Sequence, residues 1–348
     1  MAKRRNLKTI GCTLFLLLAL LLGACRPAEQ DTPKPTAQST PETTAPSTPS
    51  PWPTPRPTEG FSEVRPAAVA GAFYPTDADQ ATEMVDQYLA PVRQVDGQPI
   101  ALIVPHAAWV YSGQVAAVAY KQIEGLKYDA VVIIGPYHSA SSFDAISVYA
   151  EGAFETPLGP LPVDETLAAQ LLAAHERIVF ERGVHRQEHS IEVQLPFLQR
   201  VCPDCAFVPV LIGQPTPENL DILTQALSEA LQDKRALIIA SSDLSHYPTY
   251  DDAMRVDTAT LATIETLDSA RVSAVIADQM AQGVPGLGTC ACGEGPILVT
   301  MRVAQALGAD HVRVLYYANS GDVSGDLSRV VGYGAVMFWR WQPPEHHG

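Results

Sequence analysis

The sequence has few basic residues, and this shortage limits the partners that the protein can have. Lysine and arginine number 23 against 38 aspartates and glutamates, so the formal net charge is −15. A chain with this charge repels phosphate backbones, so nucleic acid is not expected as a partner. Apolar residues make up 47% of the chain, which is ample for a sizeable core.

Cysteine is also scarce, and internal repeats are missing. Cys202 and Cys205 have the spacing of a redox pair or of half a zinc site, but no second pair completes a zinc site. In an oxidising compartment, a local disulfide is therefore the expected state of this pair. No unit of 20–50 residues recurs, which argues against a repeat architecture.

No apolar run is long enough to cross a bilayer comfortably. The run at residues 14–22 follows a basic start at residues 3–5 and ends at Gly23-Ala24-Cys25, as in a secretory signal. Residues 22–25 are similar to the bacterial lipobox, in which the cysteine is acylated and becomes the new N-terminus; an ordinary signal or N-terminal anchor is the alternative. The sequence thus predicts an extracytoplasmic protein, lipid-anchored to a bacterial cell membrane through Cys25. Cleavage there leaves 19 basic against 38 acidic side chains, a net charge near −19.

Composition divides the chain into four parts. Residues 26–59 hold 10 of the 29 prolines and no hydrophobic period, so a semi-extended tether with a reach of up to roughly 100 Å is expected. The predicted parts are a lipoprotein signal at 1–25, a Pro/Thr/Ser tether at 26–62, a folded domain at 63–342 and a tail at 343–348.

Within the folded domain, apolar runs rich in valine and isoleucine alternate with segments of helical periodicity. Strands are predicted at 100–104, 130–134, 145–149, 207–212, 236–240, 311–318 and 330–338. Helices are predicted at 114–122, 165–174, 191–201, 217–231, 258–267, 269–280 and 296–307. Runs that are apolar throughout indicate strands covered on both faces. The predicted fold is a three-layer α/β domain with a mixed, mostly parallel central sheet, its last two strands pairing antiparallel.

Polar side chains follow three of these strands directly. His106 comes after the first strand, His138 after the second, and Asp243 and His246 after the strand at 236–240. Ligand sites of open α/β sheets lie at the carboxyl ends of the strands, so these groups are expected at one edge. A single such residue is more often a hydrogen-bonded loop residue than a ligand, so the prediction depends on the group as a whole.

Cys292 is expected at the same edge by a different route. It lies in a glycine-rich loop just before the helix predicted to begin at Pro296, where the backbone can approach another group closely. Two imidazoles and a thiolate favour iron, copper or zinc over magnesium or calcium and leave room for a further ligand. The alternatives are that Cys292 is simply buried or that, outside the cytoplasm, it is oxidised to a disulfide.

A further polar cluster spans residues 185–192. Glu188 and Glu192 would lie at the start of the helix predicted from 191, where acidic groups suit the helix dipole, so plain capping is one interpretation. His185 and His189 are four apart, but this spacing forms a zinc site only on a continuous helix. Gly183 and the polar residues around it argue against one.

Seven motifs, in order, resemble the MEMO family over essentially all of residues 65–340. They are RPAAVAGAFYP (65–75), VPHA with YSG (104–107, 111–113), GPYH (135–138), EHSIE with QLPF (188–192, 194–197), SSDLSH (241–246), CGEGP (292–296) and NSGD with SGD (319–322, 324–326). Bacterial members are often called AmmeMemoRadiSam system protein B. The resemblance implies a fold like that of the class III extradiol (LigB-like) dioxygenases, which carry a non-haem iron site at one sheet edge.

By the same resemblance, the metal ligands map to His106, His138 and Cys292, where the dioxygenases use two histidines and a carboxylate. His246 occupies the place of the dioxygenases' acid-base histidine, and Asp243 is expected to orient it or a bound water. Phe73 and Tyr74 are implied to approach the pocket, and we also expect Tyr137 and His189 there. The family commonly has glycine at Ala108 and asparagine or serine at Tyr137, so Tyr137 could narrow the pocket.

Three functions follow from this interpretation and stay open at this point. The first is a non-haem iron-dependent oxidoreductase of the dioxygenase type, with copper as the alternative metal and zinc less favoured. The absence of a ligand carboxylate weakens a simple catechol-cleavage activity. The second is a non-catalytic, metal-handling lipoprotein, and the third is a module that binds a peptide or protein on a dioxygenase-like scaffold. A small molecule or a peptide is the expected ligand.

Overall fold

The apolar runs form the central sheet of the computed structural model, which describes residues 60–139 and 142–341. The strands are β1 (Val64–Arg65), β2 (Pro99–Val104), β3 (Ala130–Pro136), β4 (Ile146–Val148), β5 (Ala153–Phe154), β6 (Leu161–Pro162), β7 (Ile178–Val179), β8 (Val208–Ile212), β9 (Ala236–Ser241), β10 (His311–Asn319) and β11 (Gly332–Trp339). The helices are α1 (Ala78–Leu89), α2 (Trp109–Lys121), α3 (Glu165–Ala174), α4 (Arg182–His185), η1 (Glu192–Gln194), α5 (Leu195–Val201), α6 (Pro217–Leu231), α7 (Tyr250–Ile264), α8 (Ser269–Ala281), α9 (Glu294–Ala306) and α10 (Gly321–Ser324).

The described residues form an eight-stranded mixed sheet in the order β10-β11-β2-β9-β3-β8-β4-β7, and a small second sheet in the order β1-β5-β6. Strands β2, β9, β3 and β8 are parallel neighbours, whereas β10, β11 and β2 pair antiparallel, as β8 and β4 do. The antiparallel pairing predicted for the last two strands is confirmed. Because β2, β3 and β9 are parallel, their carboxyl ends reach the same edge of the sheet.

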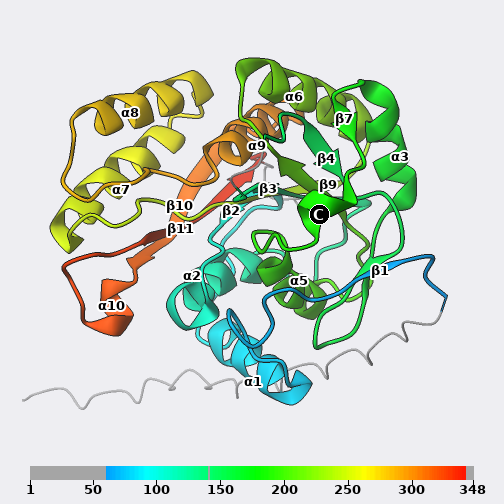
Figure 1. The fold of residues 1–348 in the computed structure, drawn as a ribbon, viewed down its shortest axis with the longest axis horizontal. Coiled ribbons are helices and arrows are strands. Elements are labelled where there is room, and N and C mark those ends of the chain that lie inside the picture. The colour runs from blue at the N-terminus through cyan, green and yellow to red at the C-terminus, as the bar shows by residue number, and fades with distance from the viewer. Residues whose placement is uncertain (1–59, 140–141, 342–348) are drawn as a thin grey trace, which may run out of the picture. The chain divides into compact units, whose positions relative to one another are not determined.

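Helices cover both faces of the large sheet (Figure 1). Helix α2 packs against β2, β10 and β11 and contacts α1 and α5, while α9 packs against β2, β3 and β9 and contacts α6 and α8. The strands β3, β8 and β9 are buried along their whole length, as apolar runs covered on both faces should be. The predicted three-layer α/β fold is confirmed.

Several helices begin where the sequence supplies a cap. The side chain of Asp164 accepts a hydrogen bond from the Leu167 N–H at the start of α3, and Thr216 does the same for Asn219 at the start of α6. Such side chains replace a backbone partner that the first helical turn lacks. The helices predicted at 165–174 and 217–231 have these bounds in the structure.

Other predicted helix bounds are wrong. Helix α2 begins five residues before the predicted residue 114. Helix α7 begins at Tyr250 rather than 258, because the first turn of α7 is polar and shows no apolar periodicity. The single helix predicted at 191–201 is divided into η1 and α5. Pro196 has no N–H to donate to the preceding turn, and the chain forms a tight turn before it.

The cysteine predictions can be compared directly. Cys202 and Cys205 form the expected local disulfide. Cys290 and Cys292 are both free thiols, so the alternative in which Cys292 forms a disulfide is wrong. The predicted signal, Cys25 and nearly all of the tether lie outside the described residues.

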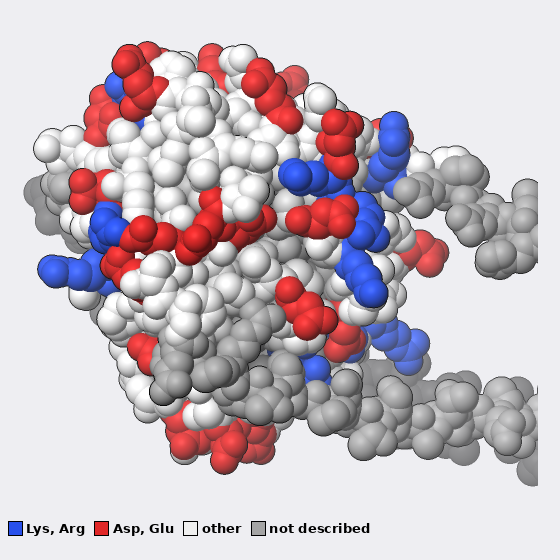
Figure 2. Space-filling model, turned by 90° about the vertical axis from the view of Figure 1, so that its right-hand side faces the viewer, with Lys and Arg blue, Asp and Glu red and all other residues white. Residues whose placement is uncertain are grey.

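Charge on the described surface is mixed. On the face drawn in Figure 2, acidic side chains form several groups, basic ones gather at a few places, and uncharged residues cover the area between them. No helix within residues 60–139 and 142–341 has the length and apolar character needed to span a bilayer.

Candidate metal centre

The carboxyl ends of β2, β3 and β9, where the sequence predicted a site, meet at a cleft of about 660 Å³. His106 follows β2, His138 follows β3, and Asp243 and His246 follow β9. The rings of His106 and His138 have their centroids 5.0 Å apart. The lining of the cleft also includes Phe73, Ala107, Ala108, Tyr111, His189, Tyr247, Ser320, Ser324, Asp326, Arg329, Val331 and Tyr333.

The ring of His106 is fixed by a hydroxyl behind it. Its Nδ1 lies 3.0 Å from Ser241 Oγ, and that hydroxyl donates to the carbonyl of Ser190 and accepts from Gln194 Nε2. Because the hydroxyl proton is used elsewhere, His106 Nδ1 carries the proton and its Nε2 keeps the lone pair. Burial lowers the pKa of His106, so the ring is neutral near pH 7. Its Nε2 faces Cys292 Sγ at 3.2 Å.

A carboxylate fixes the ring of His138 in the same way, through its Nδ1. Glu188, which is 5% exposed, accepts from His138 Nδ1 at 2.9 Å, from the His138 backbone N–H at 2.7 Å and from the Ser190 N–H at 2.8 Å. Burial raises the pKa of Glu188, but the hydrogen bonds and charge of His138 and the charge of His189 outweigh it and lower the pKa to about 2. A carboxylate on Nδ1 orients an imidazole and makes its other nitrogen a better metal donor.

Cys292 and Asp243 are joined through the backbone. The Cys292 N–H donates to the carbonyl of Asp243 at 3.3 Å. Asp243 Oδ1 accepts from the N–H groups of His106 and Ala107 at 2.7 and 3.2 Å. Burial raises the pKa of Asp243 to about 7 against these hydrogen bonds. Burial and the charge of Asp243 also raise the pKa of the Cys292 thiol. A metal ion would have to displace the proton of this thiol on binding.

His246 lines the cleft, where its ring lies against that of Tyr247. Its backbone is paired with Thr289 and Val331, while its Nε2 is buried and has no hydrogen-bond partner in the described part of the chain. Burial lowers the pKa of His246 to about 4, so the ring is neutral at pH 7. No hydrogen bond between described residues joins Asp243 to His246. The expectation that Asp243 orients His246 is therefore corrected, because Asp243 Oδ1 holds the backbone at His106 and Ala107 instead. Its alternative, that Asp243 orients a bound water, stays a prediction.

The four other residues predicted for the pocket lie in different places. Phe73 and His189 line the cleft, with their ring centroids 4.8 Å apart. Tyr74 is buried, stacks on Trp109 and is outside the cleft lining. Tyr137 packs against Phe143 and is outside the cleft lining.

Glu192 has a role that sequence reasoning missed. It lies in the first turn of η1, but its carboxylate accepts from the N–H groups of Ala68 and Val69 and from the Tyr74 hydroxyl, and it pairs with the buried Arg65. It fastens the N-terminal segment that brings Phe73 to the cleft. Only the family motif at 65–75 indicated that this segment is important. Local patterns could not show its contact with Glu192, because Tyr74 and Glu192 are more than 110 residues apart in the chain.

His185 and His189 do not share a site. His185 ends α4, is buried, and lies with its Nε2 3.0 Å from Ser147 Oγ. Among the described residues it belongs to no group of potential metal ligands, whereas His189 does. The expected absence of a continuous helix from 185 to 189 agrees with α4 ending at His185.

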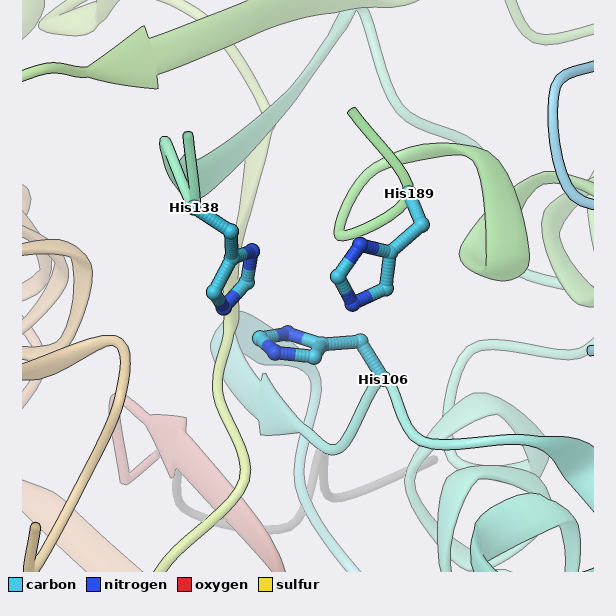
Figure 3. A group of neighbouring side chains, drawn as sticks. All are labelled: His106, His138 and His189. Carbon is cyan, nitrogen blue, oxygen red and sulfur yellow. The ribbon is translucent and has the colours of Figure 1, made fainter. Parts of the chain in front are cut away.

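Two groups of side chains could hold an ion. In one, ligand atoms of His106, His138 and His189 all lie within 4.8 Å of one another (Figure 3); in the other, those of His106, Asp243 and Cys292 do. The set implied by the family resemblance draws on both groups and shares His106 between them. Imidazole nitrogens with a thiol suit iron, copper or zinc, so the donors present fit such an ion.

Comparison with known proteins identifies the family. Residues 65–337 match the model of Memo-like proteins. The chain belongs to this family. A MEMO1 family protein of Methanobrevibacter smithii is 35% identical over 289 residues, covering 79% of this chain and 99% of the relative. One of Ignicoccus hospitalis is 36% identical over 292 residues, with 79% and 98% covered.

A solved structure of an uncharacterized Escherichia coli protein, JW3007, is similar with a TM-score of 0.46 and 12% identity, covering 68% of this chain and 98% of that one. The Memo-like membership expected from the seven motifs is confirmed by the relatives.

Proposed function

We propose that this Memo-like protein is a metal-dependent oxidoreductase of the dioxygenase type that works outside the cytoplasm on a lipid anchor. One observation carries the proposal. A free thiol, Cys292, lies with its Sγ 3.2 Å from His106 Nε2. His106 and His138 line a cleft that also contains His246, whose buried Nε2 has no hydrogen-bond partner among the described residues.

His106, His138 and Cys292 are the residues that would hold the ion, with non-haem iron favoured and copper as the alternative. When bound, such an ion supplies one-electron redox chemistry and reaction with dioxygen. The chain supplies the rest. Ser241 and Glu188 fix the imidazoles by their Nδ1 atoms, which leaves each Nε2 as the donor.

His246 is the residue that would move a proton. Its Nε2 is neutral at pH 7, because burial lowers its pKa to about 4. A buried nitrogen without a hydrogen-bond partner in the protein usually bonds to a ligand that binds and leaves. A substrate hydroxyl in the cleft would donate a hydrogen bond to it. Phe73, Tyr111 and Tyr333 offer aromatic surfaces around the same cleft, against which a planar substrate could pack while water is excluded.

Purification without chelators tests the proposal first. Wild-type protein should retain about one iron or copper per chain and consume oxygen with some member of a catechol and electron-donor panel. His106→Ala should lose both metal and turnover, whereas His246→Gln should keep the metal and lose turnover. Metal-loaded protein that is inert to every donor and to oxygen would overturn the enzymatic role.

A metal-handling function is the second candidate, favoured by the number of donors. His106, His138 and His189 form one group of potential ligands, and His106 belongs to a second with Asp243 and Cys292. The two groups together offer more donors than the three that a catalytic site with an open position requires. Tight binding without turnover, and transfer of the ion to a competing protein or chelator, would support this function over the first.

The lipid anchor is tested separately. Expression of the full chain in a bacterium fed labelled palmitate should label the wild type and place it in the membrane fraction, whereas Cys25→Ser should be unlabelled. Equal labelling of the two proteins, or a wild type found only in the cytosol, contradicts the proposed localisation.

A further inference from the structure

Arg329 is the only lysine or arginine among the described residues that line the cleft. Its guanidinium has no carboxylate partner in the described part of the chain, although the protein as a whole is acidic. Asp326 lines the same cleft, but its carboxylate accepts from the N–H and the hydroxyl of Ser328 at 2.9 and 2.6 Å. Asp243 is likewise occupied by backbone N–H groups. The charge of Arg329 therefore stays available to a ligand of the cleft.

The guanidinium lies over an aromatic ring. Its central carbon is 3.9 Å from the centroid of the Tyr247 ring, which is well within the range of a cation–π contact. A guanidinium that stacks on a ring still has its N–H groups to donate to a further acceptor. Tyr247 thus supports the position of Arg329 without using its hydrogen bonds.

The backbone of Tyr247 has an uncommon conformation for a residue other than glycine. Its φ is 73°, and its N–H donates to the Val330 carbonyl at 2.7 Å. A Cβ at Gly286 would lie 2.6 Å from the Tyr247 carbonyl oxygen, so glycine is needed there for the chains to approach. Strained residues of this kind gather at ligand sites, where their surroundings hold them. The result here is that one ring contacts both Arg329 and His246, whose ring centroid is 5.4 Å away.

We propose that Arg329 is a specificity residue that binds a carboxylate group of the substrate, and that the substrate is a small aromatic carboxylate. The inference rests on the proposed function in that it concerns the substrate of the same cleft. A guanidinium can bind a carboxylate through two parallel N–H···O hydrogen bonds, which fix its orientation as well as its position. The aromatic part of the substrate would lie across Tyr247, and a hydroxyl on it would reach His246.

The charge of the lining favours a carboxylate over a phosphate group. A phosphate ester carries a charge of about −1.5 to −2 near pH 7, whereas a carboxylate carries one negative charge. The lining has the single cation Arg329 beside two acidic residues, Asp243 and Asp326. One guanidinium balances one carboxylate and leaves a phosphate ester partly uncompensated.

Matched probes test this inference by binding, without any turnover. The affinities of para-hydroxybenzoate, para-hydroxybenzamide and para-hydroxyphenyl phosphate are measured by titration calorimetry on the full chain purified without chelators. The benzamide has the shape of the benzoate but no charge. The proteins are the wild type, Arg329→Gln and the matched control Arg313→Gln. Arg313 lies on β10, is exposed and is outside the cleft lining, so its loss changes the net charge equally.

We expect the wild type to bind the benzoate at least about 10-fold more tightly than the benzamide or the phosphate, as a charged hydrogen-bonded pair provides. Arg329→Gln should bind the benzoate and the benzamide equally, and Arg313→Gln should keep the preference. An unchanged preference in Arg329→Gln would place the carboxylate on another group, such as the ion, and overturn the inference. Equal loss in both variants, a preference for the phosphate, or a wild type that binds no probe also overturns it.

The metal content and the oxygen consumption of the same samples separate this inference from the proposed function. Iron or copper with turnover, but no preference for the benzoate, leaves the proposed function standing and removes only the role of Arg329. Metal-loaded protein that prefers the benzoate through Arg329 but is inert to oxygen and every electron donor does the reverse. It would show a carboxylate-binding cleft without oxidoreductase activity.

Discussion

Replacing Glu188 with glutamine should weaken metal binding more than it weakens the fold. The carboxylate is nearly inaccessible and accepts three hydrogen bonds, two from His138 and one from Ser190. Glutamine has the same shape but no charge, and its NH₂ group must face one of these three donors. Loss of an outer partner of this kind typically costs about 10–100-fold in metal affinity. That range corresponds to about 1.4–2.7 kcal/mol of binding free energy.

The assay measures the Co²⁺ affinity of Glu188→Gln by competition with a chromophoric chelator, with Asp257→Asn as the control. Asp257 is also a fully buried carboxylate, but it binds Ser245 and Tyr317 and touches no imidazole. We expect the two variants to lose similar amounts of folding stability and only Glu188→Gln to lose affinity. Equal affinity losses in the two variants would refute the reasoning, because they would show a general loosening of the cleft.

Three further predictions concern the framework. Arg65→Met should lower the free energy of unfolding by about 3–5 kcal/mol, since it leaves Glu192 buried with no cationic partner, and urea denaturation measures this; a loss below about 1 kcal/mol would contradict it. Burial raises the pKa of Asp257 to about 6, above its ordinary value of 3.8. The native state then holds this proton over a window in which the unfolded chain has lost it. The free energy of unfolding should fall by up to about 3 kcal/mol between pH 4 and pH 7, and Asp257→Asn should remove that component; identical pH profiles of wild type and variant would refute it. Gly332→Ala would place a Cβ 1.9 Å from Asp257 Oδ2. We expect thermal unfolding to report a loss of about 1–3 kcal/mol or more, and an unchanged melting temperature would contradict it.

Periodicity was sufficient to predict the layers of this fold because its strands are buried on both faces. Strands β3, β8 and β9 are continuous apolar runs, and helices α3 and α6 have polar caps before an apolar period. The pattern missed α1 and the two-residue strands β1, β5, β6 and β7. Those short strands are defined by partners far along the chain, such as Val64 opposite Ala153, and not by any local preference.

The site was predictable to the extent that it depends on strand ends. His106, His138, Asp243 and His246 gather because β2, β3 and β9 are parallel neighbours, which the alternation of elements already implied. The place of His189 was not predictable in this way. The path of the chain before η1 depends on the contact of Glu188 with His138, fifty residues away, and no periodic pattern records such a contact.

The loops that meet at the cleft come from distant parts of the chain, and a bound ion would link them reversibly. His106 and Cys292 alone are 186 positions apart. An ion that binds only the native state adds about 2.7 kcal/mol to stability at 100 times its Kd. Depletion of the ion would loosen these loops before the sheet beneath them. Limited proteolysis near the cleft rim should therefore report metal starvation well before the protein as a whole unfolds.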